Sequence, residues 1–208
     1  TLVDEFAQLG VKAVSLGGGG DASCHPRLPD ALRLLKSRGI ETALFTNGQL
    51  VRDDVAQAIV ACCTWTRFSL DADGPEMFKA THGMDARDFE KVKANIARVV
   101  ALRREMGSSI VLGGSFLIGS HTVSGIYGVA QLARDLGLDY IRLRPFFTWN
   151  GDLPFRAEEA DRVTGELDRA AAAFNSDTFM VSYPAARTNW VKSGTPPLNY
   201  SRCNIHHF

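Results

Sequence analysis

An alternation of short apolar runs with amphipathic stretches extends along the chain and restricts its fold more than any other feature. The apolar runs have the length of strands, and the stretches between them carry apolar residues at helical spacing. No two runs are joined by a hairpin turn. Strands that are always separated by helices pair in parallel, so we expect an α/β protein with a parallel sheet. The expected strands are Lys12–Leu16, Glu41–Phe45, Thr66–Leu70, Ser109–Ile118, Tyr140–Pro145 and Phe179–Tyr183.

The stretches between the strands read as amphipathic helices. Glycines end several of them, and Asp53-Asp54 stand where the positive end of a helix dipole favours acids. Gly113-Gly114, inside the longest expected strand, predicts a bulge or a close approach. The expected helices are Leu2–Leu9, Leu28–Arg38, one beginning at Asp53, Pro75–Ala80, Asp85–Met106, Val123–Leu136 and Ala157–Phe174.

Polar or conformationally special residues follow nearly every expected strand. An open doubly wound sheet concentrates its ligand at one crevice, whereas a barrel of β/α units builds its site from all its strand ends. The first unit also lacks the GxGxxG turn of dinucleotide-binding sheets. We therefore favour a complete or partial barrel over the open sheet. The residues in question are Gly18–Asp21, Thr46-Asn47, Ser69 with Asp71, Gly119-Ser120 and Arg144-Pro145.

Four consecutive glycines, 17 to 20, follow the first expected strand and lead into Asp21. Glycine costs backbone entropy and offers no side chain for packing, so this run serves no purpose within a strand. It suits a turn where the backbone takes unusual dihedral angles and a ligand lies against bare N–H and C=O groups. We predict the floor of a small-molecule site here, with a loose strand-to-helix loop as the alternative.

The balance of charges excludes some partner classes. The 208 residues include 23 Lys and Arg against 23 Asp and Glu, so no net field attracts nucleic acid or an anionic membrane surface. No apolar run reaches the roughly 20 residues that span a membrane. The four cysteines lack the spacing of a disulfide framework, which favours a reducing compartment. We expect a cytoplasmic protein with neither a nucleic-acid nor a membrane partner, and with Cys62 and Cys63 packed in its core.

Four motifs in this order resemble those of the radical S-adenosylmethionine (SAM) superfamily. In that family the second strand ends in a GGGEP-like turn and the third in TNG, the fourth reads SLDA, and the sixth reads like YIRLRPF. Here the corresponding segments are Gly18–Ala22, Thr46-Asn47-Gly48, Ser69–Ala72 with Pro75–Phe78 and His82-Gly83 after it, and Tyr140–Phe146. The resemblance implies a partial (β/α)6 TIM-like barrel of parallel strands with outer helices, its first strand and C-terminal extension outside this chain.

The resemblance also implies an activity. Members hold SAM and a [4Fe–4S] cluster, cleave SAM reductively to a 5′-deoxyadenosyl radical, and abstract a hydrogen atom from a peptide or a small metabolite. A flavodoxin or ferredoxin is the expected reductant. Two other functions stay open: another β/α-barrel enzyme, an aldolase or lyase that binds phosphate on the glycine turn, and a barrel without a cluster that binds SAM or a partner.

Roles for individual residues follow from the same resemblance. The carbonyls of Gly18, Gly19 and Gly20, with Asp21, would bind the methionyl amine of SAM. Thr46 and Asn47 would place the methionine or the substrate, and Ser69 would bond the SAM carboxylate or a ribose hydroxyl. The remaining expected contacts are Ile118 on the adenine face and Leu143 and Arg144 on the adenine or the carboxylate.

Three charged residues carry further expectations. Asp71, directly after the third expected strand, is the candidate catalytic carboxylate that orients substrate or SAM; a helix-capping role is the alternative. Arg142 and Arg144 are expected to point to opposite faces of their strand, so that one lies inside the barrel with an anionic partner.

The chain departs from the family pattern in two ways. Asp21 and Ala22 replace the usual Glu and Pro, which shortens the reach of the acid and loosens the turn. The cluster motif CxxxCxxC, whose thiolates hold the iron, is absent. The chain starts with Thr1, and we interpret it as an excerpt whose cluster ligands lie upstream, so that this piece alone would bind no main cluster and be inactive.

The C-terminal segment Tyr200–Phe208 resembles the entry to a Cys-rich extension of the SPASM or twitch type. In that reading residues 1–198 form the barrel, 199–208 begin the extension, and Cys203 ligates an auxiliary cluster. The alternative is a lone cysteine beside two solvent-exposed histidines.

Overall fold

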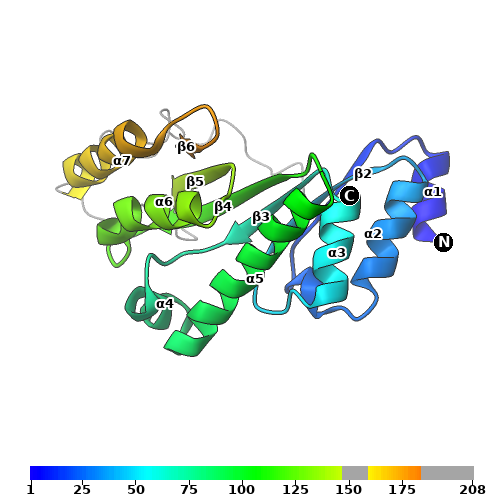
Figure 1. The fold of residues 1–208 in the computed structure, drawn as a ribbon, viewed down its shortest axis with the longest axis horizontal. Coiled ribbons are helices and arrows are strands. Elements are labelled where there is room, and N and C mark those ends of the chain that lie inside the picture. The colour runs from blue at the N-terminus through cyan, green and yellow to red at the C-terminus, as the bar shows by residue number, and fades with distance from the viewer. Residues whose placement is uncertain (147–158, 184–208) are drawn as a thin grey trace, which may run out of the picture.

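The computed structural model describes residues 1–146 and 159–183 (Figure 1). These residues form one six-stranded sheet in which every neighbouring pair is parallel, and its strand order is the order of the sequence. The predicted parallel sheet is therefore confirmed. The strands are β1 (Ala13–Leu16), β2 (Glu41–Thr46), β3 (Trp65–Ser69), β4 (Val111–Ile118), β5 (Tyr140–Pro145) and β6 (Met180–Ser182).

A helix accompanies each crossover between neighbouring strands. The predicted helices are all present, with ends moved by a few residues; the fourth continues to His82 and ends where Gly83 takes a left-handed φ of 67°. In Figure 1 helices α2, α3 and α5 lie side by side. The α-helices are α1 (Leu2–Gln8), α2 (Leu28–Ser37), α3 (Asp53–Cys62), α4 (Pro75–His82), α5 (Ala86–Glu105), α6 (Ile126–Asp135) and α7 (Ala160–Phe174).

The strand order decides between the two sheets considered above. A doubly wound sheet reverses its strand order at a switch point, which places helices on both faces. Here the order never reverses, and right-handed crossovers then place the helices on one face. The structure thus has the arrangement of a partial β/α barrel, in which the other face of the sheet faces the interior.

Burial along the strands distinguishes these two faces. Side chains toward the helices are wholly buried, as Leu44, Phe68 and Ile141 show with 0% exposure. Their neighbours in sequence point the other way, and Phe45 is 37% exposed. We call this second side the uncovered face, because no described helix covers it. It carries the row Phe45, Arg67, Gly113 and Tyr140 and, one step toward the carboxyl ends, the row Ser69, Ser115, Arg142 and Ser182.

Gly113 and Gly114 permit close approaches on both faces of β4. A Cβ at Gly113 would lie 2.1 Å from Cζ of Tyr140, and one at Gly114 would lie 2.6 Å from Cδ1 of Ile141. The pairing register runs through both glycines without interruption, so the close approach is confirmed and the bulge is wrong. On the uncovered face, the Arg67 guanidinium bonds the Tyr140 hydroxyl at 3.0 Å and lies over the Tyr140 ring.

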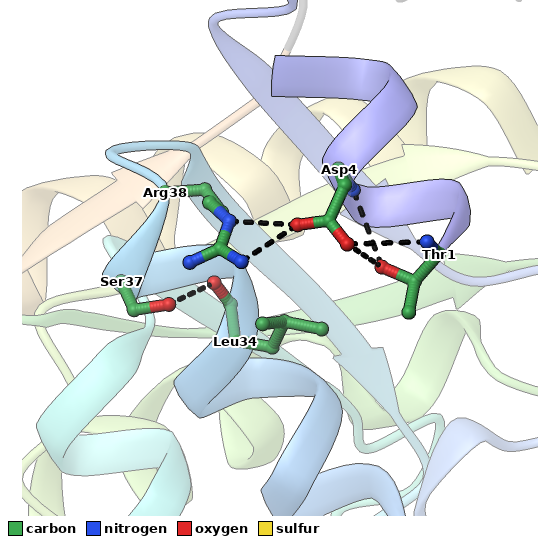
Figure 2. Close-up of polar contacts among 5 residues, drawn as sticks. All are labelled: Thr1, Asp4, Leu34, Ser37 and Arg38. Atoms are coloured by element: carbon green, nitrogen blue, oxygen red, sulfur yellow. Dashed lines mark hydrogen bonds and ion pairs between the residues drawn. The ribbon is translucent and has the colours of Figure 1, made fainter. Parts of the chain in front are cut away.

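Helix α1 is fastened to the end of α2 by an ion pair, shown in Figure 2. Asp4 and Thr1 form a capping box that begins α1, and the Asp4 carboxylate lies 2.7 Å from Nη2 of Arg38. These hydrogen bonds and the guanidinium hold the pKa of Asp4 well below its usual range. The contact fixes α1 against the first β/α unit, just before the glycine run.

Two sequence predictions about individual side chains have different outcomes. Cys63 is buried in the hydrophobic core, where desolvation raises the pKa of its thiol to about 12, and Cys62 packs against the same core. Arg142 and Arg144, in contrast, lie on the same face of β5, so the prediction of opposite faces is wrong. Side chains alternate along a strand with a period of two, and residues two apart therefore point the same way.

Candidate functional site

The glycine turn after β1 lines an open cavity of about 630 Å³. Gly18 and Gly20 have φ angles of 125° and 134°, a region that residues with a Cβ rarely adopt. The Gly20 N–H donates to the Gly18 carbonyl at 2.6 Å, which folds the turn tightly. A Cβ built on Gly18, Gly19 or Gly20 would meet nothing within 4 Å. The glycine backbone therefore borders open space, as the predicted ligand floor requires.

Asp21 links this turn to the end of the next strand. Its carboxylate accepts from the Ser23 N–H at 2.8 Å and the Ser23 hydroxyl at 2.6 Å. It also accepts from the Thr46 hydroxyl at 3.0 Å and from the Asn47 N–H at 2.5 Å. The acid that the sequence suggested as a ligand of an amine is thus occupied, at least in part, in holding β1 and β2 together at their carboxyl ends.

The segment after β2 is itself well ordered by hydrogen bonds. The Gly48 N–H donates to the Thr46 hydroxyl, the Gln49 N–H donates to Oδ1 of Asn47, and the Asn95 amide donates to the Gly48 carbonyl. Thr46 is buried while Asn47 is exposed. Of this predicted pair, only Asn47 presents its side chain to the surface next to the glycine turn.

A second cavity, of about 450 Å³, lies at the carboxyl ends of β3, β4 and β5. Asp71 lines it with a φ of 44°, and its Oδ1 accepts from the Leu117 N–H at 2.8 Å. Helix α4 begins at Gly74 without a side-chain cap, so the capping alternative for Asp71 is wrong. Burial raises the pKa of this carboxyl, against the lowering effects of the Leu117 N–H, His82 and Arg144. The other lining residues are Ala80, Thr81, His82, Leu117, Gly119, Ser120, His121, Thr122 and Phe146.

His82 contributes an imidazole to this second cavity from the end of α4. Its ring stacks on Phe78 with centroids 4.3 Å apart, and its Nδ1 lies 2.8 Å from the Thr81 hydroxyl. The Thr81 hydroxyl also reaches the Asp71 carbonyl at 3.3 Å. The cavity thus combines a buried carboxyl with an oriented imidazole, groups that suit hydroxyl or amine partners.

Three predicted contacts from β4 and β5 fall on different sides of the sheet. Ile118 and Leu143 have 0% exposure and belong to the core beneath the helices, so their side chains cannot cover an adenine as predicted. Leu117, their neighbour on the uncovered face, lines the second cavity instead. Arg144 pairs in register with Leu117 and is exposed, on the side where the prediction requires it.

The middle of the uncovered face carries polar residues that sequence reasoning missed. Ser69 is next in register to Ser115, Ser115 to Arg142, and Arg142 to Ser182. Ser115 and Ser182 lie inside expected strands rather than at their ends, which is why they drew no attention. Their alternation with buried apolar neighbours was the available signal.

The described residues do not form a site for an iron–sulfur cluster. No group of three His, Cys, Asp or Glu side chains within the described parts is placed to hold a metal ion. Cys24 is exposed beside the glycine turn. Cys62 and Cys63 lie elsewhere, at the C-terminal end of α3. Cys203, and with it the predicted boundary at residue 198, lies outside the described residues.

Comparison with known proteins decides the family. The model of the radical SAM superfamily matches residues 1–116, more than half of the chain. The chain belongs to the radical SAM superfamily. The resemblance to this family that the motifs indicated is thereby confirmed.

This chain covers only part of the length of each similar protein. A tungsten-containing aldehyde ferredoxin oxidoreductase cofactor-modifying protein of Pyrococcus furiosus is 25% identical over 140 residues, which make up 65% of this chain and 38% of that protein. The structure of Streptococcus suis SuiB bound to S-adenosylmethionine has a TM-score of 0.68 at 12% identity, over 96% of this chain and 45% of SuiB. The anSMEcpe structure with bound AdoMet and the Kp18Cys peptide has a TM-score of 0.62 at 14% identity, over 88% and 53%.

These structural likenesses establish the radical SAM partial-barrel fold. The chain spans less than half the length of the curated relative and of SuiB. None of the helices in the described ranges is long and apolar enough to cross a membrane.

Proposed function

We propose that this chain is the SAM-binding barrel of a radical SAM enzyme that acts on a peptide or a small metabolite. In the whole protein, a [4Fe–4S] cluster held by cysteines outside this chain would supply the electron that cleaves SAM to a 5′-deoxyadenosyl radical. The radical would then abstract a hydrogen atom from the substrate. A flavodoxin or ferredoxin would serve as reductant.

The glycine turn carries this proposal. Its backbone borders open space, and carbonyl oxygens there can accept hydrogen bonds from a cationic amine without a side chain in the way. Asp21 adds a negative charge beside them and holds the turn against Asn47. Gly18, Gly19 and Gly20 would therefore bind the methionyl end of SAM, and Asp21 would orient it by holding the turn in place.

The second cavity is where the nucleoside of SAM would bind. Asp71 and Ser69, at the end of β3, would accept from or donate to ribose hydroxyls, and Asp71 would in addition orient the substrate. Arg144, on the same side of the sheet, would meet the adenine or a carboxylate.

The glycine turn argues against the phosphate-binding alternative. A phosphate needs several free N–H donors, yet the Gly20 N–H already donates to the Gly18 carbonyl. The Asp21 carboxylate would also repel an anion at this position. The turn therefore does not favour a phosphate-binding aldolase or lyase.

The class of substrate is supported by similar proteins. SuiB has been crystallised with its precursor peptide SuiA, and anSMEcpe with the Kp18Cys peptide. On that basis we propose that the substrate here is also a peptide or a small molecule. An auxiliary cluster ligated by Cys203 stays part of the proposal for the longer protein.

Release of 5′-deoxyadenosine tests the proposed function. The full-length protein is reconstituted anaerobically with iron and sulfide, its iron and sulfide contents are measured, and SAM and dithionite are added. We expect a loaded cluster and production of 5′-deoxyadenosine. A loaded cluster without SAM cleavage would remove the enzyme proposal, and failure to load any cluster would favour the barrel that only binds SAM or a partner.

A further inference from the structure

The centre of the uncovered face carries a cation flanked by hydroxyls. Ser115, Arg142 and Ser182 are consecutive in register on β4, β5 and β6, and all three point away from the helices. Ser115 is only 9% exposed, and Arg142 and Ser182 are half-buried. Within the described residues, none of these three side chains has a hydrogen-bond or ionic partner.

Arg142 is placed to bind a ligand. Its half-buried guanidinium carries five donors that an anion can accept from, at a position where hydration is reduced. Arg67, another cation on the uncovered face, does have partners. Its guanidinium donates to the Tyr140 hydroxyl and lies against aromatic rings. Arg142 is left facing the barrel interior, flanked on both sides by serine hydroxyls that can also donate.

The charges around Arg142 favour an anion. On the described strands, the acidic residues of the uncovered side lie at its two ends: Glu41 begins β2, and Asp71 follows β3. The Glu41 carboxylate is bonded by the Thr64 hydroxyl, and that of Asp71 by the Leu117 N–H. The middle rows therefore carry positive charge without a described carboxylate among them.

We propose that Ser115, Arg142 and Ser182 form an anion site that binds a carboxylate or phosphate group of the substrate. The guanidinium would bond two oxygens of the anion side by side, and the serine hydroxyls would donate to it from the neighbouring strands. Its identification as a substrate site rests on the proposed function.

The alternative source of an anion is SAM, whose amino-acid group carries its own carboxylate. That carboxylate and the amine share one carbon atom, so a methionyl amine bound at the glycine turn keeps the carboxylate near β1. Three strands separate β1 from β5 in the sheet, and neighbouring strands lie about 4.8 Å apart. Arg142 is accordingly placed for a different molecule, on the far side of the interior from the turn.

Anion binding by the full-length protein tests the site without any turnover. The probes are inorganic phosphate and succinate, titrated at constant ionic strength against the unliganded protein, with SAM titrated separately. The variants are Arg142→Gln, Arg142→Lys and Ser115→Ala. The control is Arg87→Gln, because the Arg87 side chain is 92% exposed at the start of α5.

We expect at least one probe to bind the wild type and Arg87→Gln alike, and to bind Arg142→Gln about tenfold or more weakly. Arg142→Lys should fall between them, Ser115→Ala should weaken the same probe, and SAM affinity should stay within about twofold in all variants. Equal probe binding by wild type and Arg142→Gln, or by neither, would overturn the site. A loss of SAM affinity in Arg142→Gln would assign the anion to SAM and overturn the substrate assignment.

Two controls keep the outcomes separate. Thermal melting identifies a variant that fails to fold, in which case Arg142→Lys and Ser115→Ala decide the result. A wild-type protein that binds the probe but not SAM would overturn the proposed function while leaving the anion site in place.

Discussion

The backbone N–H of Asn47 donates to the side-chain carboxylate of Asp21 across 2.5 Å, joining the ends of two neighbouring strands. Through this contact the glycine turn after β1 and the turn after β2 form one rigid edge of the candidate site. The family's usual glutamate would place its carboxylate one methylene further out. The shorter aspartate therefore acts first as a positioning residue, and we expect the SAM affinity of the whole protein to depend on it.

Replacing Asp21 tests this positioning role. Asp21→Ala removes acceptors from Ser23, Thr46 and Asn47. We expect the free energy of unfolding to fall by about 1–3 kcal/mol and the SAM dissociation constant to rise about tenfold. Asp21→Asn should lie between, because an amide keeps one acceptor oxygen. Urea unfolding and equilibrium dialysis measure the two effects, with Asp30→Ala on the exposed side of α2 as control. Unchanged stability together with lost SAM binding would instead make Asp21 a direct ligand.

Gly18, Gly19 and Gly20 should separate stability from binding. Alanine at Gly18 or Gly20 would have to adopt a φ above 120°, and we expect each change to cost about 1–3 kcal/mol of stability. Gly19 has no such φ, and its added Cβ would meet nothing in the unliganded protein. We expect Gly19→Ala to melt like the wild type but to bind SAM more weakly, since the methyl group enters the ligand space. Wild-type SAM affinity in Gly19→Ala would refute this placement.

The carboxyl of Asp71 should make the free energy of unfolding depend on pH. Burial raises its pKa in the folded protein above the value in the unfolded chain. Its favourable contribution is therefore complete at pH below the unfolded value and is lost as pH rises through the folded value. Asp71→Asn stays neutral, and its amide oxygen still accepts from the Leu117 N–H. The stability of this variant relative to wild type should rise between pH 4 and 7, as measured by urea unfolding; a constant difference would contradict the burial of a charge.

Cys24 offers a chemical probe of the glycine-turn cavity. It lines that cavity and is exposed, whereas Cys63 is buried with a pKa raised to about 12. Iodoacetamide should alkylate Cys24 in the native protein and leave Cys63 unmodified. Saturating SAM should slow the alkylation of Cys24 severalfold, as mass spectrometry of the peptides would measure. Equal rates with and without SAM would show that the ligand lies elsewhere.

Much of the fold was predictable from the sequence because its signals are local. Alternating apolar periodicities located the strands and helices, and strand ends located both cavities. The pair Gly113-Gly114 predicts a close approach. The groups that approach are the Tyr140 ring on one face of β4 and Ile141 on the other, and their positions depend on the pairing between strands.

The errors have the same origin. Ile118 and Leu143 were placed on the ligand side although the strand pleat turns them into the core, and Arg142 and Arg144 were separated although the pleat keeps them together. The occupation of Asp21 by Ser23, Thr46 and Asn47 could not be read from spacing, because it depends on how two strand ends meet in space. The row of Ser115, Arg142 and Ser182 likewise exists only once the register is known.

The structure of the full-length protein with SAM bound tests the central claim most directly. We expect the methionyl amine to lie within hydrogen-bonding distance of carbonyl oxygens of Gly18–Gly20, and the nucleoside to extend toward Asp71. A SAM molecule bound away from the glycine turn, with those glycines facing solvent, would contradict it.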